Sequence, residues 1–431
     1  IKYEYHRFYP NQQLASHILG FTDVDEKGLE GVELSFDSVL SGEPGYKLIN
    51  RDALQRQIIT PDAEVQMPKH GDHVMLTIDA NIQRFTEEEL EIAYKKWTPT
   101  SATAIVMDPM TGEVLAMCNY PTYDPNHFKK YPTGSRRNLA ITDCYEPGSI
   151  MKPIIVSGIF EQGLVKPDDV LFCNNGVCEL EGRILHDTHG GHGNLTVSEI
   201  VAYSSNIGMA KLGMLMGNEK MYRYLEQFNF GERTGIELPG EIGGIFRPLK
   251  QWSRKYSLIS ISIGHEIAVT PLQFVTAFCS IPNGGLLPEP TIIKSSINND
   301  GKTKEEFQSL QPVRRVISSN IARNIMNPIL VKVVTEGTGK NANLLEYDVA
   351  GKTGTSQKTS GGRFSHEKFV GSFIAYAPAE YPRVCVLVMI NEPQNGAYYG
   401  GTVAAPVVRE IIRRSLLYLG VEPSKFQIAM Q

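Results

Sequence analysis

Residues 145–160 read YEPGSIMKPIIVSGIF, a stretch that contains both a helix start and a candidate nucleophile. The Pro-Gly pair directly before Ser149 breaks the chain, and an apolar run with helical character follows Lys152. The stretch therefore predicts a helix that begins near Ser149. Because Pro153 lies four residues after Ser149, we expect the first turn to be irregular or 3₁₀-like.

Ser149 and Lys152 form a Ser-x-x-Lys string and share one face of the helix at positions i and i+3. A serine hydroxyl is a poor nucleophile until a neighbouring base removes its proton. A lysine can act as that base when burial or nearby cations lower its pKa toward neutrality. A helix N-terminus also offers backbone N–H groups to a developing oxyanion. The pair is thus a candidate centre for acyl transfer.

A second string, Ser-x-Asn, is formed by Ser204 and Asn206. Neither string is rare at this chain length, because residues 296–298 and 318–320 repeat Ser-x-Asn and Ser365 begins another Ser-x-x-Lys. The Ser365 copy follows a pair of glycines, where we expect a loop between two strands and no helix. We therefore treat the Ser365 copy as a chance match.

A third string, Lys352-Thr353-Gly354, occurs once and is followed by Thr355 on an expected strand over residues 347–357. Gly354 would let a substrate backbone approach closely, and the Lys352 ammonium with the threonine hydroxyls can hold a carboxylate. Taken alone, an edge strand protected by a lysine explains this string better. The presence of all three strings in this order reverses that preference.

The surrounding elements predict an α+β fold. Residues 104–118 have the pattern of a β-hairpin, and residues 347–357, 369–377 and 383–390 each predict a strand. We expect the early hairpin and the late strands to form one antiparallel sheet. Helix starts are marked by capping side chains at three positions: Asp79, Thr196 and Thr270.

Composition excludes several classes of protein. The 431 residues are 42% hydrophobic and 21% charged, which is typical of a globular chain of about two or three domains. The formal net charge of −5 argues against nucleic acid as a main partner. No stretch reaches the ~18 uninterrupted apolar residues of a membrane span. Because the chain opens at Ile1 without a signal-like segment, we expect an N-terminal segment to have been removed or left out.

Cysteines and histidines leave alternatives open. Cys173 and Cys178 flank a turn signal, so they could face each other across a hairpin as a disulfide or remain free thiols. Two thiols are too few to favour a zinc site. His186, His189 and His192 stand at three-residue spacing among glycines, where loop packing and hydrogen bonding are better explanations than metal ligation. We expect neither a metal nor a cofactor.

The order of the three strings resembles that of the penicillin-recognising acyl-serine transferases. Further segments look like class B penicillin-binding proteins, and residues 138–153 and 399–406 resemble the cell-division (septal) branch of that family. Ile150 stands where the family commonly has Thr. The segments that carry the wider resemblance are 76–79, 108–113, 145–149, 350–356 and 399–406, with 7–10, 28–33 and 42–45 similar to the family's non-catalytic N-terminal module.

The resemblance implies an architecture. Residues 1–72 would be a truncated N-terminal dimerisation or pedestal module, residues 73–422 the transpeptidase domain and residues 423–431 a C-terminal tail. The transpeptidase domain would have the fold shared with serine β-lactamases, which is an antiparallel sheet flanked by helices with an all-helical subdomain.

The resemblance also implies roles for the residues of the first two strings. Ser149 would attack the penultimate D-Ala carbonyl of a peptidoglycan stem peptide and release the terminal D-Ala, while Lys152 would accept the serine proton. Ser204 would relay protons, and Asn206 would hold the substrate amide. The amine of a second stem peptide would then take the acyl group and form a cross-link.

The third string would bind the donor peptide. Lys352, Thr353 and Thr355 would hold the terminal carboxylate beside Gly354, and the backbone N–H groups of Ser149 and Thr355 would form the oxyanion hole. A β-lactam would acylate the same serine.

Partners and location follow from the same resemblance. We expect a membrane glycosyltransferase and divisome proteins as partners, an N-terminal anchor in the cytoplasmic membrane ahead of Ile1, and an extracytoplasmic or periplasmic catalytic domain. The alternative activities are a D,D-carboxypeptidase, a β-lactam-hydrolysing enzyme and a non-catalytic β-lactam sensor with the same strings. The chain lacks the Glu-x-x-Leu-Asn loop of class A β-lactamases, and its intact Ser149, Lys152 and Lys352 argue against a sensor.

Overall fold

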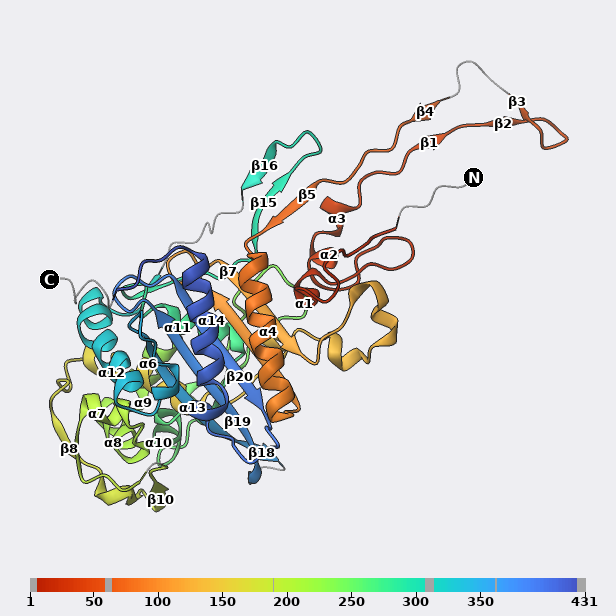
Figure 1. Ribbon diagram of the computed structural model, residues 1–431. Coiled ribbons are helices and arrows are strands. Elements are labelled where there is room, and N and C mark those ends of the chain that lie inside the picture. Colours follow the sequence, from red (N-terminus) through yellow and green to blue (C-terminus); the bar gives the residue numbers. More distant parts are fainter. Residues whose placement is uncertain (1–5, 59–63, 189, 307–313, 361–362, 425–431) are drawn as a thin grey trace.

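The larger body of the molecule is built on an antiparallel sheet (Figure 1). The computed structural model describes residues 6–58, 64–188, 190–306, 314–360 and 363–424. Within these ranges the sheet has five strands in the order β18-β19-β20-β6-β7, so the early hairpin joins the late strands as predicted. The strands are β18 (Ala350–Ser360), β19 (Arg363–Ala377), β20 (Val384–Asn391), β6 (Ser101–Met107) and β7 (Val114–Tyr120).

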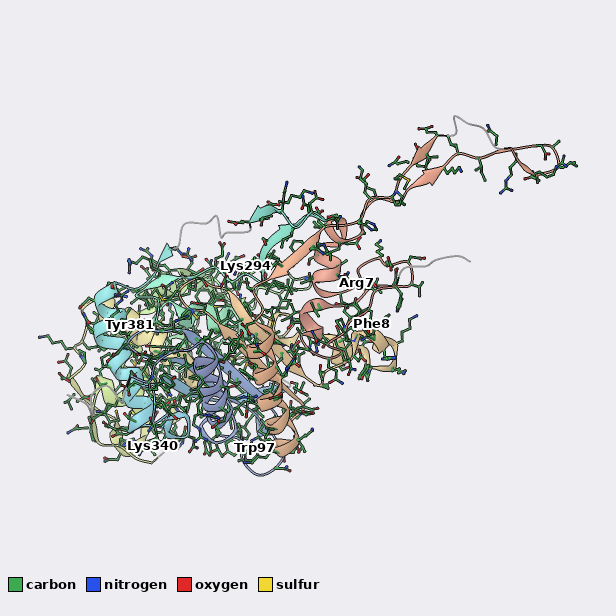
Figure 2. The ribbon with its side chains drawn as sticks, turned by 45° about the horizontal axis from the view of Figure 1, so that its top comes forward. Arg7, Phe8, Trp97, Lys294, Lys340 and Tyr381 are labelled. Carbon is green, nitrogen blue, oxygen red and sulfur yellow. The ribbon has the colours of Figure 1, made fainter. Side chains whose placement is uncertain are left out.

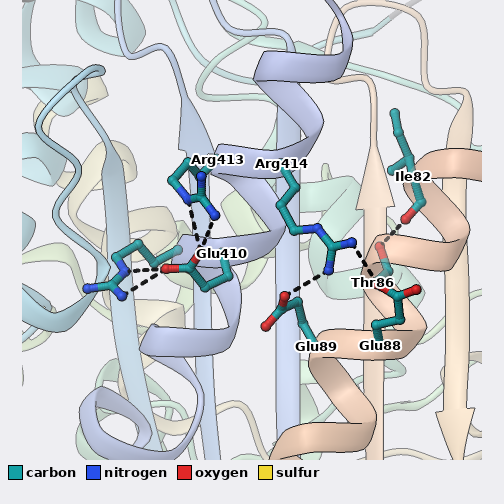
Figure 3. Close-up of polar contacts among 8 residues, drawn as sticks. Ile82, Thr86, Glu88, Glu89, Glu410, Arg413 and Arg414 are labelled. Atoms are coloured by element: carbon teal, nitrogen blue, oxygen red, sulfur yellow. Dashed lines mark hydrogen bonds and ion pairs between the residues drawn. The ribbon is translucent and has the colours of Figure 1, made fainter.

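Two long helices cover one face of this sheet. The helices α4 (Ala80–Trp97) and α14 (Ala405–Tyr418) lie side by side over it (Figure 1). Asp79 caps α4 as predicted, because its carboxylate accepts hydrogen bonds from the backbone N–H groups of residues 81 and 82. Arg414 of α14 forms ion pairs with Glu88 and Glu89 of α4 (Figure 3).

A helical layer covers the opposite face. Residues of β6 alternate between the two layers, so that Ala104 and Val106 pack with α4 and α14 while Ile105 and Met107 pack with the other helices. Both capping boxes predicted from the sequence, at Thr196 and Thr270, are formed. The helices are α6 (Lys152–Glu161), α7 (Val197–Ala202), α8 (Asn206–Met216), α9 (Asn218–Glu226), α10 (Ser257–Ser262), α11 (Pro271–Cys279) and α12 (Asn327–Thr335).

The N-terminal part of the chain is small and contains no long helix among its described residues. Its strands project as a long arm away from the body (Figure 1). The Tyr123 hydroxyl donates a hydrogen bond of 2.8 Å to the backbone oxygen of Ser16, which ties the base of this part to the body. Its elements are α1 (Ser16–Leu19), α2 (Gly31–Ser35), α3 (Asp37–Leu40), β1 (Tyr46–Lys47), β2 (Asn50–Arg51), β3 (Gln57–Ile58) and β4 (Val65–Gln66).

A three-stranded sheet connects this part to the middle of the chain. β5 (His73–Leu76) pairs with β15 (Ile293–Ile297), which pairs in turn with β16 (Thr303–Glu306). No described helix is both long and apolar enough to cross a membrane.

One detail decides between the alternatives that the sequence left open, and another corrects an expectation. Cys173 and Cys178 are free thiols, and the hairpin is formed by β9 (Val177–Leu180) and β10 (Arg183–His186) rather than by the segment between the cysteines. Cys178 packs in a small cluster with Leu185, while Cys173 packs in the main core, so the two side chains are buried in different clusters. Ser365 lies on β19 rather than in a loop, because that strand begins at Arg363.

Candidate active site

Ser149 lies on a 3₁₀ turn, Gly148–Met151, that continues directly into α6. The irregular first turn predicted from Pro153 is therefore confirmed. Side chains at i and i+3 eclipse in a 3₁₀ helix, which puts Ser149 and Lys152 on one face. Ser149 is partly exposed, whereas Lys152 is completely buried.

The Lys152 ammonium brings the first two strings together. Its Nζ donates hydrogen bonds to the backbone oxygen of Ser204 at 2.7 Å, to Ser204 Oγ at 3.1 Å and to Asn206 Oδ1 at 2.8 Å. Ser204 lies in the tight turn between α7 and α8 with a φ of 63°, a conformation that is strained for a non-glycine residue. This turn aims both the carbonyl and the hydroxyl of Ser204 at the lysine.

Lys352, on the edge strand β18, joins Lys152 and Ser204 in one hydrogen-bonded cluster. Its Nζ donates to Ser204 Oγ at 3.0 Å, to Thr353 O at 3.0 Å and to Thr353 Oγ1 at 3.2 Å. The Ser204 hydroxyl thus bridges two buried ammonium groups, one from each side of the site. A proton can pass between the two lysines through this hydroxyl, because it both donates and accepts hydrogen bonds.

Burial changes the protonation of both lysines. Desolvation lowers the pKa of Lys152 to about 7, against an opposing effect of the Asp187 carboxylate. Burial and the positive charge of Lys152 hold the pKa of Lys352 well below its usual value. A substantial fraction of Lys152 is therefore neutral near pH 7, which is the state in which an amine can remove a proton from serine.

Asp187 is a site residue that sequence reasoning missed. Its Oδ1 accepts hydrogen bonds from the backbone N–H groups of Asn206 at 2.6 Å and Ile207 at 3.1 Å, and its Oδ2 accepts from Ser205 Oγ at 2.8 Å. It therefore fixes the first turn of α8. Its charge also raises the pKa of Lys152, against the lowering caused by burial. Only its place between two histidines marked it in the sequence, because its partners lie 18–20 residues away.

The histidines of the glycine-rich stretch have structural partners. The backbone oxygen of His186 accepts a hydrogen bond of 3.0 Å from Asn206 Nδ2, and the His192 ring stacks on Tyr203 with 5.2 Å between centroids. His189 lies outside the described residues. Throughout the described ranges no three His, Cys, Asp or Glu side chains are grouped as a metal site would require.

Close packing between β18 and the Ser149 turn explains why residue 354, in the Lys-Thr-Gly string, is a glycine. A Cβ on Gly354 would lie 2.3 Å from Ser372 Oγ and 2.9 Å from Ile150 Cγ2. The glycine is therefore required by close packing inside the protein, a reason that differs from the substrate approach expected from the sequence. A Cβ on Gly148 would lie 3.4 Å from the backbone oxygen of Thr355, so the turn and the strand are in direct contact.

β18 is the outer strand of its sheet and therefore has one unpaired backbone edge. The Thr355 hydroxyl on this strand accepts a hydrogen bond of 3.1 Å from the backbone N–H of Gly400. Beside Thr353 and Thr355 opens a hollow of about 500 Å³. The site thus combines a partly exposed hydroxyl, two buried amines of lowered pKa and an open strand edge, which is suited to acyl transfer from an extended peptide.

A second set of contacts holds the Ser149 turn from the opposite side. The Glu146 carboxylate pairs with His265 Nδ1 at 2.7 Å and accepts from the backbone N–H of Glu266 at 2.9 Å. The backbone N–H of Gly148 donates to Gly264 O at 3.0 Å. Together with the packing against β18, these contacts fix the turn from both flanks.

Comparison with known proteins gives a consistent result across the chain. Residues 102–413 match the family described as the penicillin binding protein transpeptidase domain, and residues 1–76 match the penicillin-binding protein dimerisation domain. Stage V sporulation protein D of Bacillus subtilis is 38% identical over 426 residues, which are 98% of this chain and 65% of the relative. Peptidoglycan D,D-transpeptidase FtsI of Escherichia coli is 32% identical over 98% of this chain and 69% of its own length.

Solved structures agree with the sequence relatives. Penicillin binding protein 3 from Mycobacterium tuberculosis, complexed with aztreonam, superposes with a TM-score of 0.86 at 32% identity, over 97% of this chain and 91% of that chain. The same protein complexed with ampicillin gives a TM-score of 0.85, also at 32% identity, over 97% of this chain and 90% of that chain.

Proposed function

Because this chain belongs to the penicillin-binding protein transpeptidase family, we propose that it is a peptidoglycan D,D-transpeptidase that works through an acyl ester on Ser149. The observation that carries the proposal is the Ser204 hydroxyl, which bridges the buried Lys152 and Lys352 beside the Ser149 turn. Such a cluster of perturbed amines next to a nucleophile is expected at an active site and has no evident value for folding.

Acylation begins with the neutral form of Lys152. Its amine removes the proton of the Ser149 hydroxyl while Oγ attacks the penultimate D-Ala carbonyl of a stem peptide. The backbone N–H groups of Ser149 and Thr355 stabilise the oxyanion. When the peptide bond breaks, the proton passes from Lys152, directly or through Ser204, to the nitrogen of the leaving D-Ala.

The donor is positioned by its terminal carboxylate. Lys352, Thr353 and Thr355 bind this group, while Asn206 holds the substrate amide and Gly354 allows the strand to pack against the Ser149 turn. A bound carboxylate favours the charged form of Lys352, so the substrate restores a charge that burial otherwise suppresses. The unpaired edge of β18 accommodates the extended peptide.

A second stem peptide completes the reaction. Its amine attacks the ester carbonyl, a new peptide bond forms, and the bond from the carbonyl carbon to Ser149 Oγ breaks. Lys152 takes the proton that the amine loses and returns it to the serine oxygen. A β-lactam enters at the acylation step and leaves the serine esterified.

The wider biological setting is part of the proposal. We assign residues 1–72 to the non-catalytic module, 73–422 to the transpeptidase domain and 423–431 to a tail. We place the enzyme at the outer face of the cytoplasmic membrane, with a septal role alongside a membrane glycosyltransferase and divisome proteins. Support comes from the FtsI relatives and from the septal resemblance of residues 138–153 and 399–406.

Labelling with a fluorescent penicillin, followed by mass spectrometry of the modified peptide, tests the proposal. We expect a stable adduct on Ser149 that is lost in Ser149→Ala and retained in Ser365→Ala, which removes the other serine of a Ser-x-x-Lys string. An adduct on another peptide would refute the assignment of the nucleophile. An adduct that hydrolyses rapidly would indicate a β-lactamase instead.

A further inference from the structure

The hollow beside Thr353 and Thr355 borders the residues to which the proposed function assigns the terminal carboxylate of the donor, on the side of the leaving D-Ala. Its wall also includes Tyr203, Thr338 and Lys340. Tyr203 directly precedes Ser204, and Thr353 Oγ1, which lies 2.6 Å from Thr338 Oγ1, accepts a hydrogen bond of 3.2 Å from Lys352, so the wall of the hollow adjoins the proton-transfer cluster. A group bound there would lie next to the reacting atoms.

The hollow has a positive and polar character. None of the described residues that line it is Asp or Glu, and hydroxyl groups contribute much of the wall. Lys340 is exposed, and its ammonium group forms no hydrogen bond or ion pair with any other described residue. A cation without a partner at the rim of a polar hollow attracts an anionic group.

The rim that carries Lys340 is fixed in place. The neighbouring Asn341 donates a hydrogen bond of 2.7 Å from Nδ2 to the backbone oxygen of Gly401. On the other side His192 stacks on Tyr203, which gives the hollow a flat aromatic wall. These contacts join segments that are far apart in the sequence, so the hollow is a formed site and not a loose gap.

The chemistry of transpeptidation gives the hollow an occupant. The leaving group of acylation is the amine of D-Ala, and the attacking group of the second step is also an amine. By microscopic reversibility the incoming amine attacks from the position that the leaving amine vacates. That position lies beside Thr353 and Thr355, where the carboxylate of the departing D-Ala is bound, and it opens into the hollow.

We propose that this hollow is the subsite for the acceptor peptide, and that Lys340 selects an acceptor with a second carboxylate beyond the one on the amine-bearing carbon. This inference rests on the proposed transpeptidase function. The acceptor nitrogen bonds to the acyl carbon, the ester bond to Ser149 Oγ breaks, and Lys152 moves the proton from nitrogen to oxygen. Lys340 takes no part in these bond changes and acts as a specificity residue.

A competition between two acceptors tests the inference. An N-acyl-D-alanyl thioester supplies the donor, and the products formed with D-glutamate and with D-glutamine are measured by chromatography. The two acceptors differ only in the charge of the side chain. We expect the wild type to favour D-glutamate, and Lys340→Ala to reduce that preference by about fivefold, the upper range for an exposed ion pair. Lys340→Glu should favour D-glutamine.

The matched control is Lys294→Ala. Lys294 is another exposed lysine, on β15, and Figure 2 shows it well away from Lys340. We expect the acceptor preference of Lys294→Ala to equal that of the wild type.

The outcomes separate the inference from the proposed function. If penicillin does not acylate Ser149 in the wild type, the proposed function fails. If acylation proceeds but the wild type shows no preference for D-glutamate, transfers to neither acceptor, or keeps its preference in Lys340→Ala and Lys340→Glu, the acceptor subsite is refuted. Because both acceptors are measured on the same variant, a general loss of activity does not affect the ratio.

Discussion

Two clusters of charged side chains in this molecule differ in balance and in burial. Between α4 and α14, Arg414 pairs with Glu88 and Glu89, so every cation has an acid beside it near the surface (Figure 3). In the active site Lys152 and Lys352 are both buried and share one neutral hydroxyl. Against the effect of partial burial, Glu88 and Glu89 raise the pKa of Arg414, whereas burial lowers the pKa of Lys152 and of Lys352 and makes such amines reactive.

The strongest way to test this comparison is to make the same replacement in both clusters. Lys152→Met removes the base that activates Ser149, and we expect the rate of acylation by penicillin to fall by about 10³-fold, within the usual range for loss of a general base. The rate is measured as the second-order rate constant of adduct formation, with circular dichroism to verify folding. A folded Lys152→Met protein that acylates at the wild-type rate would contradict the role of Lys152.

The next largest effect concerns the packing around the buried cluster. In Gly354→Ala the added Cβ meets Ser372 Oγ and Ile150 Cγ2, so we expect the free energy of unfolding to fall by about 1–3 kcal/mol. Urea denaturation measures the change. The control is Gly134→Ala, where a Cβ has no neighbour within 4 Å. Equal stability of the two variants would show that the strand and the Ser149 turn are not tightly packed.

A smaller effect is expected when Asp187 is replaced, because its carboxylate counteracts the lowering of the Lys152 pKa by burial. Acylation requires the neutral amine, so the wild-type rate should rise with pH through about 7 and then level off. Asp187 raises the pKa of Lys152, and therefore Asp187→Asn should move the midpoint of the pH–rate profile to lower pH. Glu181→Gln, an exposed acid in the neighbouring hairpin turn, should leave the midpoint in place. An unchanged midpoint in Asp187→Asn would rule out this electrostatic role.

The smallest effect is expected at the surface. Arg414→Met makes the same exchange of a cation for a thioether as Lys152→Met, but at a cluster near the solvent. We expect it to lower the free energy of unfolding by about 1 kcal/mol or less and to leave the acylation rate unchanged. Thermal unfolding and the penicillin assay give the two values. A large loss of acylation would show that the two clusters are coupled.

The sequence predicted the features that depend on short-range signals. Asp79, Thr196 and Thr270 cap helices through partners two or three residues away, and Pro153 predicted an irregular or 3₁₀-like first turn, which is the 3₁₀ turn before α6. The predicted strands were confirmed. Both faces of the central strands are buried, so these strands are long apolar runs in the sequence and are easy to recognise.

Features that depend on long-range contacts were not predictable from these signals. Asp187 acts on a turn 18–20 residues later, and nothing in the spacing of its neighbours indicates that contact. Cys173 and Cys178 are close in sequence, but their side chains are buried in different hydrophobic clusters. Gly354 is constrained by Ser372 on the adjacent strand, and this contact exists only after the sheet has formed.

The pairing of β6 with β20 has a consequence for the order in which the chain acquires structure. Asn391 Nδ2 donates to Ser101 Oγ, a contact between residues 290 positions apart. The early hairpin of β6 and β7 therefore lacks its central partner until residues 384–391 have been synthesised. Such distant pairing slows folding and leaves an apolar strand edge open to other chains in the meantime. We therefore expect this domain to depend on protection from aggregation while it folds.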